Sequence, residues 1–371
     1  MAAVGITRIE TYDAAAIRES FERLLDETGQ SDFVRPGERI LVKPNILAGF
    51  PPERAVTTHP AVVEAVLGAV IDRSAIPIVG DSPGGVLRGT KTVYAKTGIA
   101  DVAKKMGAEI IPLEAKGARK IPLPDRQTLH ISKIVDEVDG IVDLAKLKSH
   151  SLELMTLAVK NLYGLVPGFR KAEYHKIYPT PYKFAGLVVN LYSHIAPKIR
   201  LAVVDGIVGM DGNGPSAGRP RKLGIFALSD SAPALDDFVE NFVGLKKHSP
   251  IVNVLRKRGL IPDYEVKTLP PAPEKPKNFK IPSNLHLYFL PAWFTRIAGR
   301  LVQVKPGVDE AKCIKCGECF KSCPGGAISM EIGRTPPKFD YSKCIRCYCC
   351  HEICPVGAIV FKKSPLTRLV E

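Results

Sequence analysis

The segment CIRCYCCHEICP, residues 344–355, repeats the cysteine spacing of an earlier segment, CIKCGECFKSCP, residues 313–324. Both segments read C-x2-C-x2-C-x3-C-P, the spacing of bacterial ferredoxins that hold two 4Fe-4S clusters. In this pattern three cysteines of one motif bind one cluster, and the fourth cysteine binds the other cluster. The spacing therefore predicts two 4Fe-4S clusters, whose ligands are Cys313, Cys316, Cys319 and Cys354 for the first and Cys344, Cys347, Cys350 and Cys323 for the second.

The chain has nine cysteines, so one of them, Cys349, is left over. A disulfide framework would need an oxidising compartment, which nothing in the sequence indicates. Zinc sites favour paired C-x2-C units separated by a longer gap. The repeats PGGAI, residues 324–328, and PVGAI, residues 355–359, favour two related halves of a small ferredoxin-like α+β unit. We interpret Cys349 as a bystander thiol, with a cluster-tuning or redox role as the alternative.

The composition is that of a globular protein with a basic excess. The chain of 371 residues has a formal net charge of +14, which thiolate ligation of two clusters would lower to about +10. No dense basic run precedes Lys305, so nucleic-acid binding is disfavoured. No apolar run is long enough for a transmembrane segment, and the start lacks the pattern of a secretory signal. We expect a cytoplasmic protein, in an anaerobic setting because such clusters are oxygen-sensitive.

A proline-rich segment divides the chain. PPAPEKPKNFKIP, residues 270–282, is typical of a stiff linker. The following segment contains Trp293, and we expect it to pack the ferredoxin unit against the rest of the chain; the alternative is a surface for a partner or a membrane. The predicted division is an α/β body at residues 1–268, a linker and packing segment at 269–304, and a two-cluster ferredoxin-like domain at 305–371.

Helical and strand patterns alternate through the body. AAAIRESFERLLDETG and TTHPAVVEAVLGAVIDR are amphipathic or capped helices, and Thr57 or Thr58 is expected near the start of the second. RILVKPNIL, AIPIVGDSP, DGIVDLAKLKSH and IRLAVVDGIVGMDGNG read as strands that run into loops. This alternation predicts an α/β fold, with a largely parallel sheet and helices on both faces.

Polar residues gather where the predicted strands end. Ligands of open α/β sheets bind outside the carboxyl ends of the strands, which makes these positions candidates for a binding site. Taken singly, a strand-end Asp or Lys is more often a turn or cap residue. GDSPGG lacks the ending of a phosphate-binding Walker loop, and no GxGxxG follows the first strand. The strand-end residues are Lys43, Asn45, Asp81, Lys146, Lys148, His150, Asp205, Asp211 and Asn213.

The order of several motifs resembles a known family. VKPN, TTHP, GDSPGG, LAKLKSH, LAVKNLYGLVPG, VVDGIVGMDGNGP and SDSAPALDDF look like the "domain of unknown function 362" family, many of whose members carry a C-terminal two-cluster ferredoxin. The resemblance implies an iron–sulfur protein and an α/β body distantly similar in fold to nickel-pincer lactate racemases. By this resemblance, the positions that recur in the family correspond here to Lys43, Asn45, Thr58, His59, Asp81, Lys146, Lys148, His150, Lys160, Asn161, Asp205, Asp211, Asn213, Asp230 and Asp236.

Two residues are expected to act in catalysis. Lys148 and His150 are two apart on a strand end and point to the same side, and imidazole titrates near neutrality, so His150 is a candidate proton donor. The alternative is that the lysine is solvated and the histidine caps a helix. His59 is interpreted as a capping residue, and His175 is a candidate for a lid. The expected substrate-binding residues are Lys43, Asn45, Asp81, Lys146, Lys160, Asn161, Asp211 and Asn213; for Asp211 and Asn213 a tight turn is the favoured alternative.

Two functions fit these features. We favour an enzyme, in which electrons pass through two 4Fe-4S clusters to a small anionic substrate in a Lys/His-lined cleft of the body. The alternative is a relay or assembly module that docks on a partner redox enzyme. Either function requires an electron donor or acceptor protein as a partner.

Overall fold

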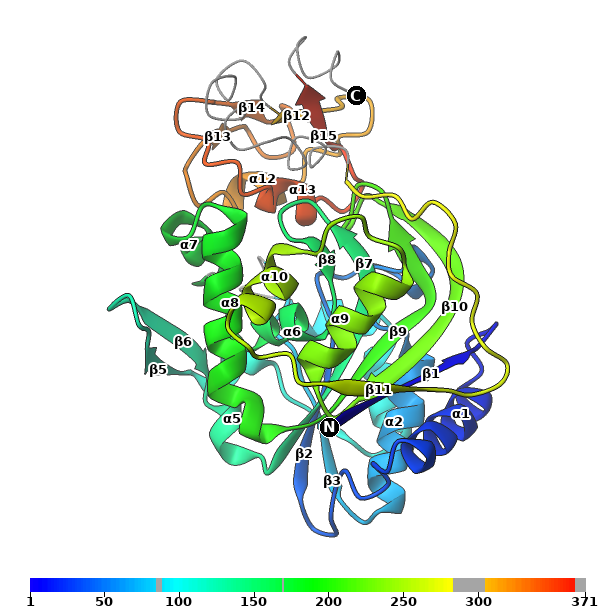
Figure 1. Ribbon diagram of the computed structural model, residues 1–371. Coiled ribbons are helices and arrows are strands. Elements are labelled where there is room, and N and C mark those ends of the chain that lie inside the picture. Colours follow the sequence, from blue (N-terminus) through cyan, green and yellow to red (C-terminus); the bar gives the residue numbers. More distant parts are fainter. Residues whose placement is uncertain (85–88, 169, 283–303, 364–371) are drawn as a thin grey trace.

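The computed structural model describes residues 1–84, 89–168, 170–282 and 304–363. Within them, a nine-stranded sheet forms the centre of the body, in the order β11-β1-β10-β9-β7-β2-β3-β4, and β8 pairs with β7 (Figure 1). The strands are β1 (Ala2–Arg8), β2 (Arg39–Pro44), β3 (Ile76–Val79), β4 (Glu109–Ile110), β7 (Gly140–His150), β8 (Leu154–Thr156), β9 (Ile199–Asp211), β10 (Arg219–Ser229) and β11 (Tyr264–Thr268).

The predicted largely parallel sheet is confirmed. The run β9-β7-β2-β3-β4 is parallel throughout, and β11 is parallel to β1. Strand β10 is antiparallel to both of its neighbours, β9 and β1. The parallel run brings the carboxyl ends of β2, β3 and β7 to one edge, which is the edge that faces the C-terminal unit in Figure 1.

Helices cover both faces of the sheet, as expected. On one face, α1 (Ala14–Glu27), α2 (Pro60–Asp72), α3 (Thr90–Lys96) and α4 (Ile99–Lys105) pack on alternate strand residues such as Val142 and Val203. On the other, α8 (Pro181–Ile195), α9 (Ala232–Phe242) and α10 (Pro250–Lys257) pack on residues such as Ile141 and Val204. The remaining elements of the body include α5 (Ile134–Glu137), α6 (Ala158–Asn161), α7 (Arg170–Ile177) and the hairpin β5 (Ala118–Pro122) and β6 (Thr128–Ser132).

One local prediction is confirmed and one changes. His59 caps α2 as expected, since its Nδ1 accepts a hydrogen bond from Ala61 N at 3.2 Å. Thr58 instead joins two strands, since its hydroxyl donates to Leu144 O at 2.6 Å and accepts from Asn45 N at 2.9 Å. Asp205 does not mark a strand end, because β9 continues to Asp211.

The C-terminal unit has the expected ferredoxin-type α+β organisation. Strand β12 (Val304–Val308) pairs with β15 (Ile359–Lys363), and β13 (Ile328–Ser329) pairs with β14 (Lys338–Phe339). Each cysteine motif contains one short helix, α12 (Glu318–Lys321) or α13 (Cys349–Glu352). The two motifs share their backbone conformation: φ is +82° at Gly317 and +61° at the matching Tyr348. The halves of the unit are therefore structural repeats.

Helix α13 docks the C-terminal unit on the body. Ile353, at its end, packs in an apolar cluster with Phe50, Val56 and Met210. The Ser216 hydroxyl donates to His351 O at 3.1 Å. The linker before residue 283 lies along the body, where Gly212 N donates to Lys280 O at 2.7 Å. The expected packing segment with Trp293 lies outside the described residues, and the three domain boundaries stay predictions.

Candidate functional site

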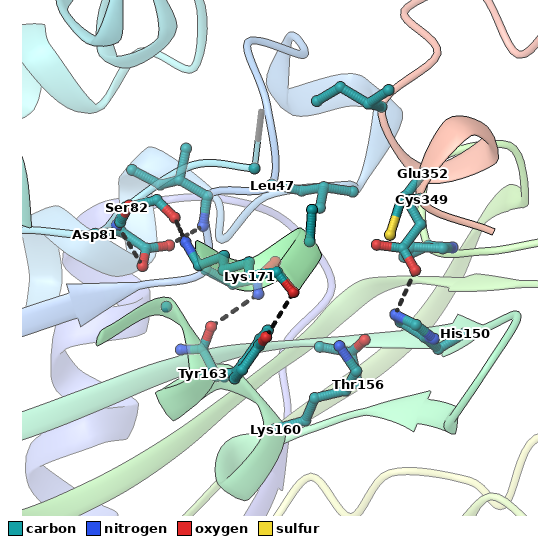
Figure 2. Close-up of a pocket in the computed structure, with 18 of the residues that line it drawn as sticks. Leu47, Asp81, Ser82, His150, Thr156, Lys160, Tyr163, Lys171, Cys349 and Glu352 are labelled. Atoms are coloured by element: carbon teal, nitrogen blue, oxygen red, sulfur yellow. Dashed lines mark hydrogen bonds and ion pairs between the residues drawn. The ribbon is translucent and has the colours of Figure 1, made fainter. Parts of the chain in front are cut away.

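A cavity of about 120 Å³ lies between the body and the C-terminal unit (Figure 2). One water needs roughly 10–15 Å³ of such space, so the cavity has room for a small organic molecule. Most of its wall comes from strand ends and helices of the body, and α13 completes it. The lining includes Asn45, Asp81, Ser82, Lys148, His150, Thr156, Lys160, Asn161, Tyr163, Lys171, His175, Ser322, Cys349, Glu352 and Ile353.

His150 faces the C-terminal unit across this cavity. Its Nδ1 accepts hydrogen bonds from Leu152 N at 3.1 Å and Glu153 N at 3.2 Å, so the proton of the neutral ring sits on Nε2. Nε2 lies 3.2 Å from Oε1 of Glu352 on α13. Burial, with help from the charge of Lys160, lowers the pKa of His150 to about 4 and keeps the ring neutral near pH 7. His150 therefore both caps the β7–β8 turn and presents an N–H toward Glu352.

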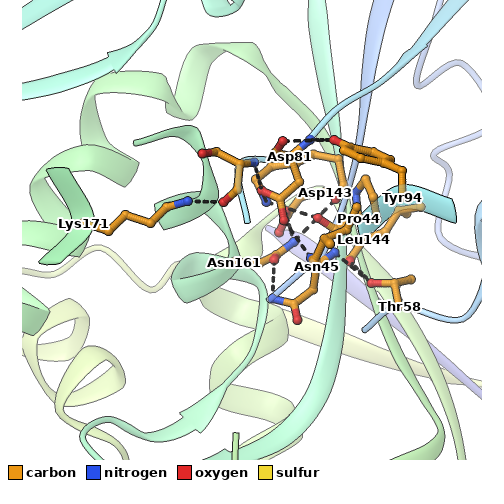
Figure 3. Close-up of polar contacts among 12 residues, drawn as sticks. Pro44, Asn45, Thr58, Asp81, Tyr94, Asp143, Leu144, Asn161 and Lys171 are labelled. Carbon is orange, nitrogen blue, oxygen red and sulfur yellow. Dashed lines mark hydrogen bonds and ion pairs between the residues drawn. The ribbon is translucent and has the colours of Figure 1, made fainter. Parts of the chain in front are cut away.

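Lys148 begins a buried chain of hydrogen bonds, and Figure 3 shows its continuation from Asn45 through Asn161 to Asp143. Its Nζ donates to Asn45 Oδ1 and to Val56 O, both at 2.6 Å. Asn45 Nδ2 donates to Asn161 Oδ1 at 2.8 Å, and Asn161 Nδ2 donates to Asp143 Oδ1 at 2.8 Å. Burial lowers the pKa of Lys148 well below its usual range and raises the pKa of Asp143 to about 7. This network fixes the Lys148 side chain at the cavity wall.

Lys160 differs from the other lysines of the site. Its ammonium has no hydrogen bond or ion pair with any residue in the described ranges, although burial lowers its pKa. Thr156 Oγ1 and His175 Nδ1, on side chains that are 2% and 6% exposed, likewise have no partner in the described part of the chain. Buried polar groups are normally paired. The two carboxylate oxygens of Glu153 are also buried and unpaired in the described part of the chain, and the charges of Glu153 and Glu352 act on Lys160, so this region holds unsatisfied groups of opposite charge.

Lys171 and Asp81 form the opposite end of the cavity. Lys171 Nζ donates to Ser82 O, and burial, opposed by Asp81, lowers the pKa of Lys171 to about 8. Asp81 accepts from Ile46 N at 2.7 Å and pairs with Lys43 Nζ at 3.0 Å. Tyr94 holds the Asp81 backbone, because its hydroxyl accepts from Asp81 N at 2.6 Å. The end with Asp81 is therefore already satisfied by the protein.

Several of the expected substrate-binding residues do not line this cavity. Lys43 is fully buried behind the wall, in its ion pair with Asp81. Lys146 points to Asp205 Oδ2 and the Tyr12 hydroxyl, each at 2.8 Å. Asp211 pairs with Arg221 at 3.0 Å and with Arg219 at 3.3 Å, and Asn213 lies in the following turn. The structure brings together Asn45, Asp81, Lys148, His150, Lys160 and Asn161.

The sequence interpretation missed Thr156, Lys171, Ser322 and Glu352, and it set Cys349 aside as a bystander. Thr156 stands in a segment with no special composition. Lys171 opens the basic and aromatic stretch KAEYHKIYPTPY, residues 171–182, in which only His175 was considered, as part of a lid. Cys349 did carry a signal, because it was the one cysteine that the cluster spacing left without a role. His175, suggested for a lid, forms part of the wall and stacks on Phe184 with ring centroids 4.2 Å apart.

The eight motif cysteines surround two smaller cavities. One is lined by Cys313, Cys316, Cys319 and Cys354, and the other by Cys323, Cys344, Cys347 and Cys350. Backbone N–H groups point at two of these sulfur atoms: Ala327 N to Cys323 Sγ at 3.3 Å, and Ala358 N to Cys354 Sγ at 3.1 Å. Four thiols around one cavity suit a cluster that binds each thiolate through a different iron.

A single metal ion would need a different arrangement. In the described ranges, no three His, Cys, Asp or Glu side chains are placed to hold one ion. The described helices also include none that is long and apolar enough to cross a membrane.

Comparisons with known proteins match both parts of the chain. A family model described as domain of unknown function (DUF362) matches residues 40–239, and one described as a 4Fe-4S dicluster domain matches residues 305–355. A relative named "Thylakoid-associated protein sll1697", from Synechocystis sp. (strain ATCC 27184 / PCC 6803 / Kazusa), is 34% identical over 290 residues, which are 76% of this chain and 88% of that protein. The iron–sulfur prediction is confirmed: the C-terminal unit is a 4Fe-4S-binding domain.

Two solved structures show a partial likeness. The lactate racemase apoprotein from Thermoanaerobacterium thermosaccharolyticum has a TM-score of 0.39 and 13% identity, over 60% of this chain and 53% of that one. A protein from Thermotoga maritima has a TM-score of 0.38 and 12% identity, over 59% of this chain and 56% of that one. The chain thus spans little more than half of each, and neither likeness bears on function.

Proposed function

The chain belongs to the DUF362 family, and from this premise and the cavity we propose that it is an iron–sulfur oxidoreductase. Electrons pass through two 4Fe-4S clusters to a small anionic substrate in the cavity. The observation that carries this proposal is that α13, which sits among the cluster cysteines, also supplies Cys349 and Glu352 to the cavity wall. A ligand there lies beside a cluster, so no further carrier is needed.

The second quartet is the one nearest the cavity. Ser322 and Cys349, both in the wall, are next in the chain to Cys323 and Cys350, which line the same cluster cavity. A bound 4Fe-4S cluster would supply or accept one electron at this point. Of the wall residues from the C-terminal unit, only Ile353 is next in the chain to a cysteine of the first quartet, Cys354. We therefore infer that the second cluster exchanges electrons with the ligand, and the first with a partner.

An anionic substrate fits the unsatisfied part of the wall. Lys160 provides a cation without a partner in the described ranges, and the hydroxyl of Thr156 can donate a hydrogen bond. A carboxylate or phosphate group would satisfy both. Lys148 and Lys171 add positive charge when protonated, while Asp81 and Glu352 in the wall and Glu153 beside Lys160 oppose it. These contacts support a small ligand with one anionic group near Lys160.

We propose that His150 acts in catalysis as a hydrogen-bond donor to the substrate; the expected role as proton donor does not fit, because a ring whose pKa is about 4 is neutral near pH 7. Its Nε2–H faces the cavity, and its Nδ1 is held by two backbone N–H groups, so the ring orientation is fixed. Oε1 of Glu352 lies 3.2 Å from this Nε2 and helps to fix the direction of the N–H. Lys148 acts as a positioning group, because its two hydrogen bonds hold Asn45 and the β2 exit in place. Both roles remain proposals.

A partner surface is available on the first quartet. Large apolar side chains are exposed around the first motif: Ile314 is 59% exposed, Ile332 is 52% and Phe320 is 43%. Such a patch suits transient docking of an electron donor or acceptor protein. It also favours the second candidate function, a relay that serves a partner enzyme without using the cavity. The cytoplasmic location and the anaerobic setting stay predictions.

Reoxidation of the reduced protein tests the proposal. The holoprotein is reduced anaerobically, the reductant is removed, and the return of cluster absorbance is followed after addition of fractionated small anions or of a protein fraction. We expect a small anion to drive recovery in the wild type and not in Lys160→Met. Lys176→Met, which removes an exposed lysine of α7, is the matched control. Recovery that needs a protein fraction and is equal in all three proteins would establish the relay instead.

A further inference from the structure

Cys349 lies between the ligand cavity and the cluster site of the second quartet. Its side chain lines the ligand cavity (Figure 2). Its thiol is also hydrogen-bonded to Sγ of Cys347, one of the four cysteines around the second cluster site, and its backbone N–H is directed at the same sulfur atom. The other eight of the nine cysteines make up the two quartets, so Cys349 contacts a cluster ligand without being one.

The direction of this hydrogen bond follows from the chemistry of the two sulfur atoms. Cysteine binds iron as a thiolate, which has no proton to give, so Cys347 is the acceptor. A thiol that binds no metal ionises with a pKa of about 8.5 and keeps its proton at neutral pH. The S–H group of Cys349 is therefore the donor, and the charge on its partner strengthens the bond.

We propose that Cys349 raises the reduction potential of the second cluster through this hydrogen bond. A donor to a ligand sulfur withdraws electron density from the cluster and stabilises its reduced form, which carries one more negative charge. The cluster itself is indicated independently of Cys349, by the match of residues 305–355 to a 4Fe-4S dicluster domain and by the four thiols around the site. The proposal needs a bound cluster and does not depend on which substrate the ligand cavity takes.

The first motif carries an acid where the second carries this donor. The two backbones follow the same path, with φ of +57° at Lys315 and +58° at the matching Arg346. The residue that matches Cys349 is Glu318, whose ionised carboxylate can only accept hydrogen bonds and which pairs with Lys321 at 3.1 Å. The thiol therefore acts on one cluster only. It favours the passage of electrons from the first cluster to the second, which is the one beside the ligand cavity.

The size of the effect follows from the usual strength of one hydrogen bond. One such bond changes an equilibrium constant by about fivefold. Here the affected equilibrium is the distribution of one electron between the two clusters, so the potential of the second cluster should change by ~40 mV. A redox titration resolves a shift of this size.

Such a titration of the holoprotein tests the proposal. The anaerobic protein with both clusters is titrated without substrate, and electron paramagnetic resonance follows the two one-electron steps. Cys349→Ala removes the donor, so we expect one step to move to a potential lower by ~40 mV and the other to stay in place. Cys349→Ser keeps an O–H donor and should stay closer to the wild type. No shift in Cys349→Ala, or an equal shift in both variants, would overturn the proposal.

Glu318→Ala is the matched control, because it truncates the same position of the first motif and, like Cys349→Ala, keeps all eight cysteines of the quartets. It should leave the step that Cys349→Ala moves at its wild-type potential. An equal displacement of that step would show that the effect does not come from the thiol.

Resonance Raman spectroscopy of the oxidised holoprotein gives a second readout. Loss of the donor should strengthen the iron–sulfur bond of Cys347, so one Fe–S stretching band should rise in frequency in Cys349→Ala and not in Glu318→Ala. An unchanged band in Cys349→Ala would contradict the hydrogen bond.

The outcomes separate this inference from the proposed function, since the titration uses no substrate. A shifted potential in a protein that no small anion reoxidises would leave the role of Cys349 intact and remove the oxidoreductase proposal. An unshifted potential in a protein that small anions reoxidise in a Lys160-dependent way would have the opposite meaning.

Discussion

Oε1 of Glu352, on the helix that lies among the cluster cysteines, is 3.2 Å from Nε2 of His150, at the end of the central strand β7. This contact joins the two parts of the chain at the wall of the cavity. Because Nδ1 of His150 is occupied by two backbone N–H groups, only Nε2 is free to face Glu352. The state of His150 is thus tied both to the fold of β7 and to the docking of α13.

His150→Asn should weaken the acid sensitivity of the fold. Burial lowers the pKa of His150 to about 4, whereas an unfolded histidine titrates near 6.5. Between these values the unfolded chain binds a proton that the folded chain does not. The stability contributed by neutral His150 is therefore present above about pH 6.5 and lost as the pH falls to 4, by roughly 2 kcal/mol between pH 7 and pH 5.

The measurement is the free energy of urea unfolding at pH 7 and pH 5, for both proteins. Asn keeps an acceptor near the Nδ1 position, so the caps on Leu152 and Glu153 are preserved while the titration is removed. The wild type should lose more stability than His150→Asn over this range. Equal losses in both proteins would show that His150 does not titrate with a lowered pKa.

Gly164→Ala should destabilise the body by about 3 kcal/mol or more. A Cβ at this position would lie 2.0 Å from Asp81 Oδ1 and 2.5 Å from Lys43 Nζ, so the added methyl group would force a buried ion pair apart. The control is Gly186→Ala inside helix α8, where the nearest atom to a Cβ is an Arg258 nitrogen at 3.7 Å.

Thermal or urea unfolding of the two glycine variants checks this prediction. Gly186→Ala should raise the free energy of unfolding by roughly 0.5–1 kcal/mol, because alanine is the better helix former. A Gly164→Ala protein as stable as the wild type would mean that Asp81 and Lys43 can move apart at little cost.

Asp236→Ala should disturb both stability and ligand binding. The buried Asp236 carboxyl accepts hydrogen bonds from Ala158 N at 2.7 Å and Val159 N at 2.9 Å, and it thereby holds the start of α6. Its loss leaves two buried N–H groups without acceptors, at a cost of about 2–4 kcal/mol. Lys160 is carried by the same short helix, so affinity for a cavity ligand should fall as well.

Asp230→Ala is the matched control for this change. Asp230 follows β10 at an exposed position, and its substitution should alter the free energy of unfolding by less than about 0.5 kcal/mol. Urea unfolding followed by circular dichroism gives the comparison. If both aspartate variants unfold alike, Asp236 does not support α6 as described.

Serine substitutions should reveal the crossed assignment of the clusters. Cys354 is the fourth cysteine of the second motif but lines the cavity of the first quartet. After reduction, Cys354→Ser should therefore give the same electron paramagnetic resonance signal as Cys313→Ser. It should differ from the signal of reduced Cys344→Ser. Each variant should retain about half of the iron, since one quartet stays intact. A Cys354→Ser signal that matches Cys344→Ser would refute the crossed ligation.

Much of the fold was predictable, because its signals are local. The cysteine spacing of each motif and the strand–helix alternation of the body depend on neighbours in the chain. Asn45, Lys148, His150 and Lys160 were also identified as site residues. Lys146 and Lys148 are two residues apart on one strand, so the sequence predicted that both side chains face the site. The pairing of β7 with β9 shifts register between these two residues. Lys146 consequently contacts Asp205, while Lys148 reaches the cavity.

The sequence by itself determined the iron–sulfur unit and the class of the body, since thiolate spacing and hydrophobic periodicity follow from covalent geometry and local burial. Only the tertiary structure decided where the two meet. Ser151 and His351, in contact across the interface, are 200 residues apart, and no local pattern encodes such a contact. That docking turned Cys349 from a spare thiol into part of a cavity wall, and it brought Glu352 to within 3.2 Å of His150.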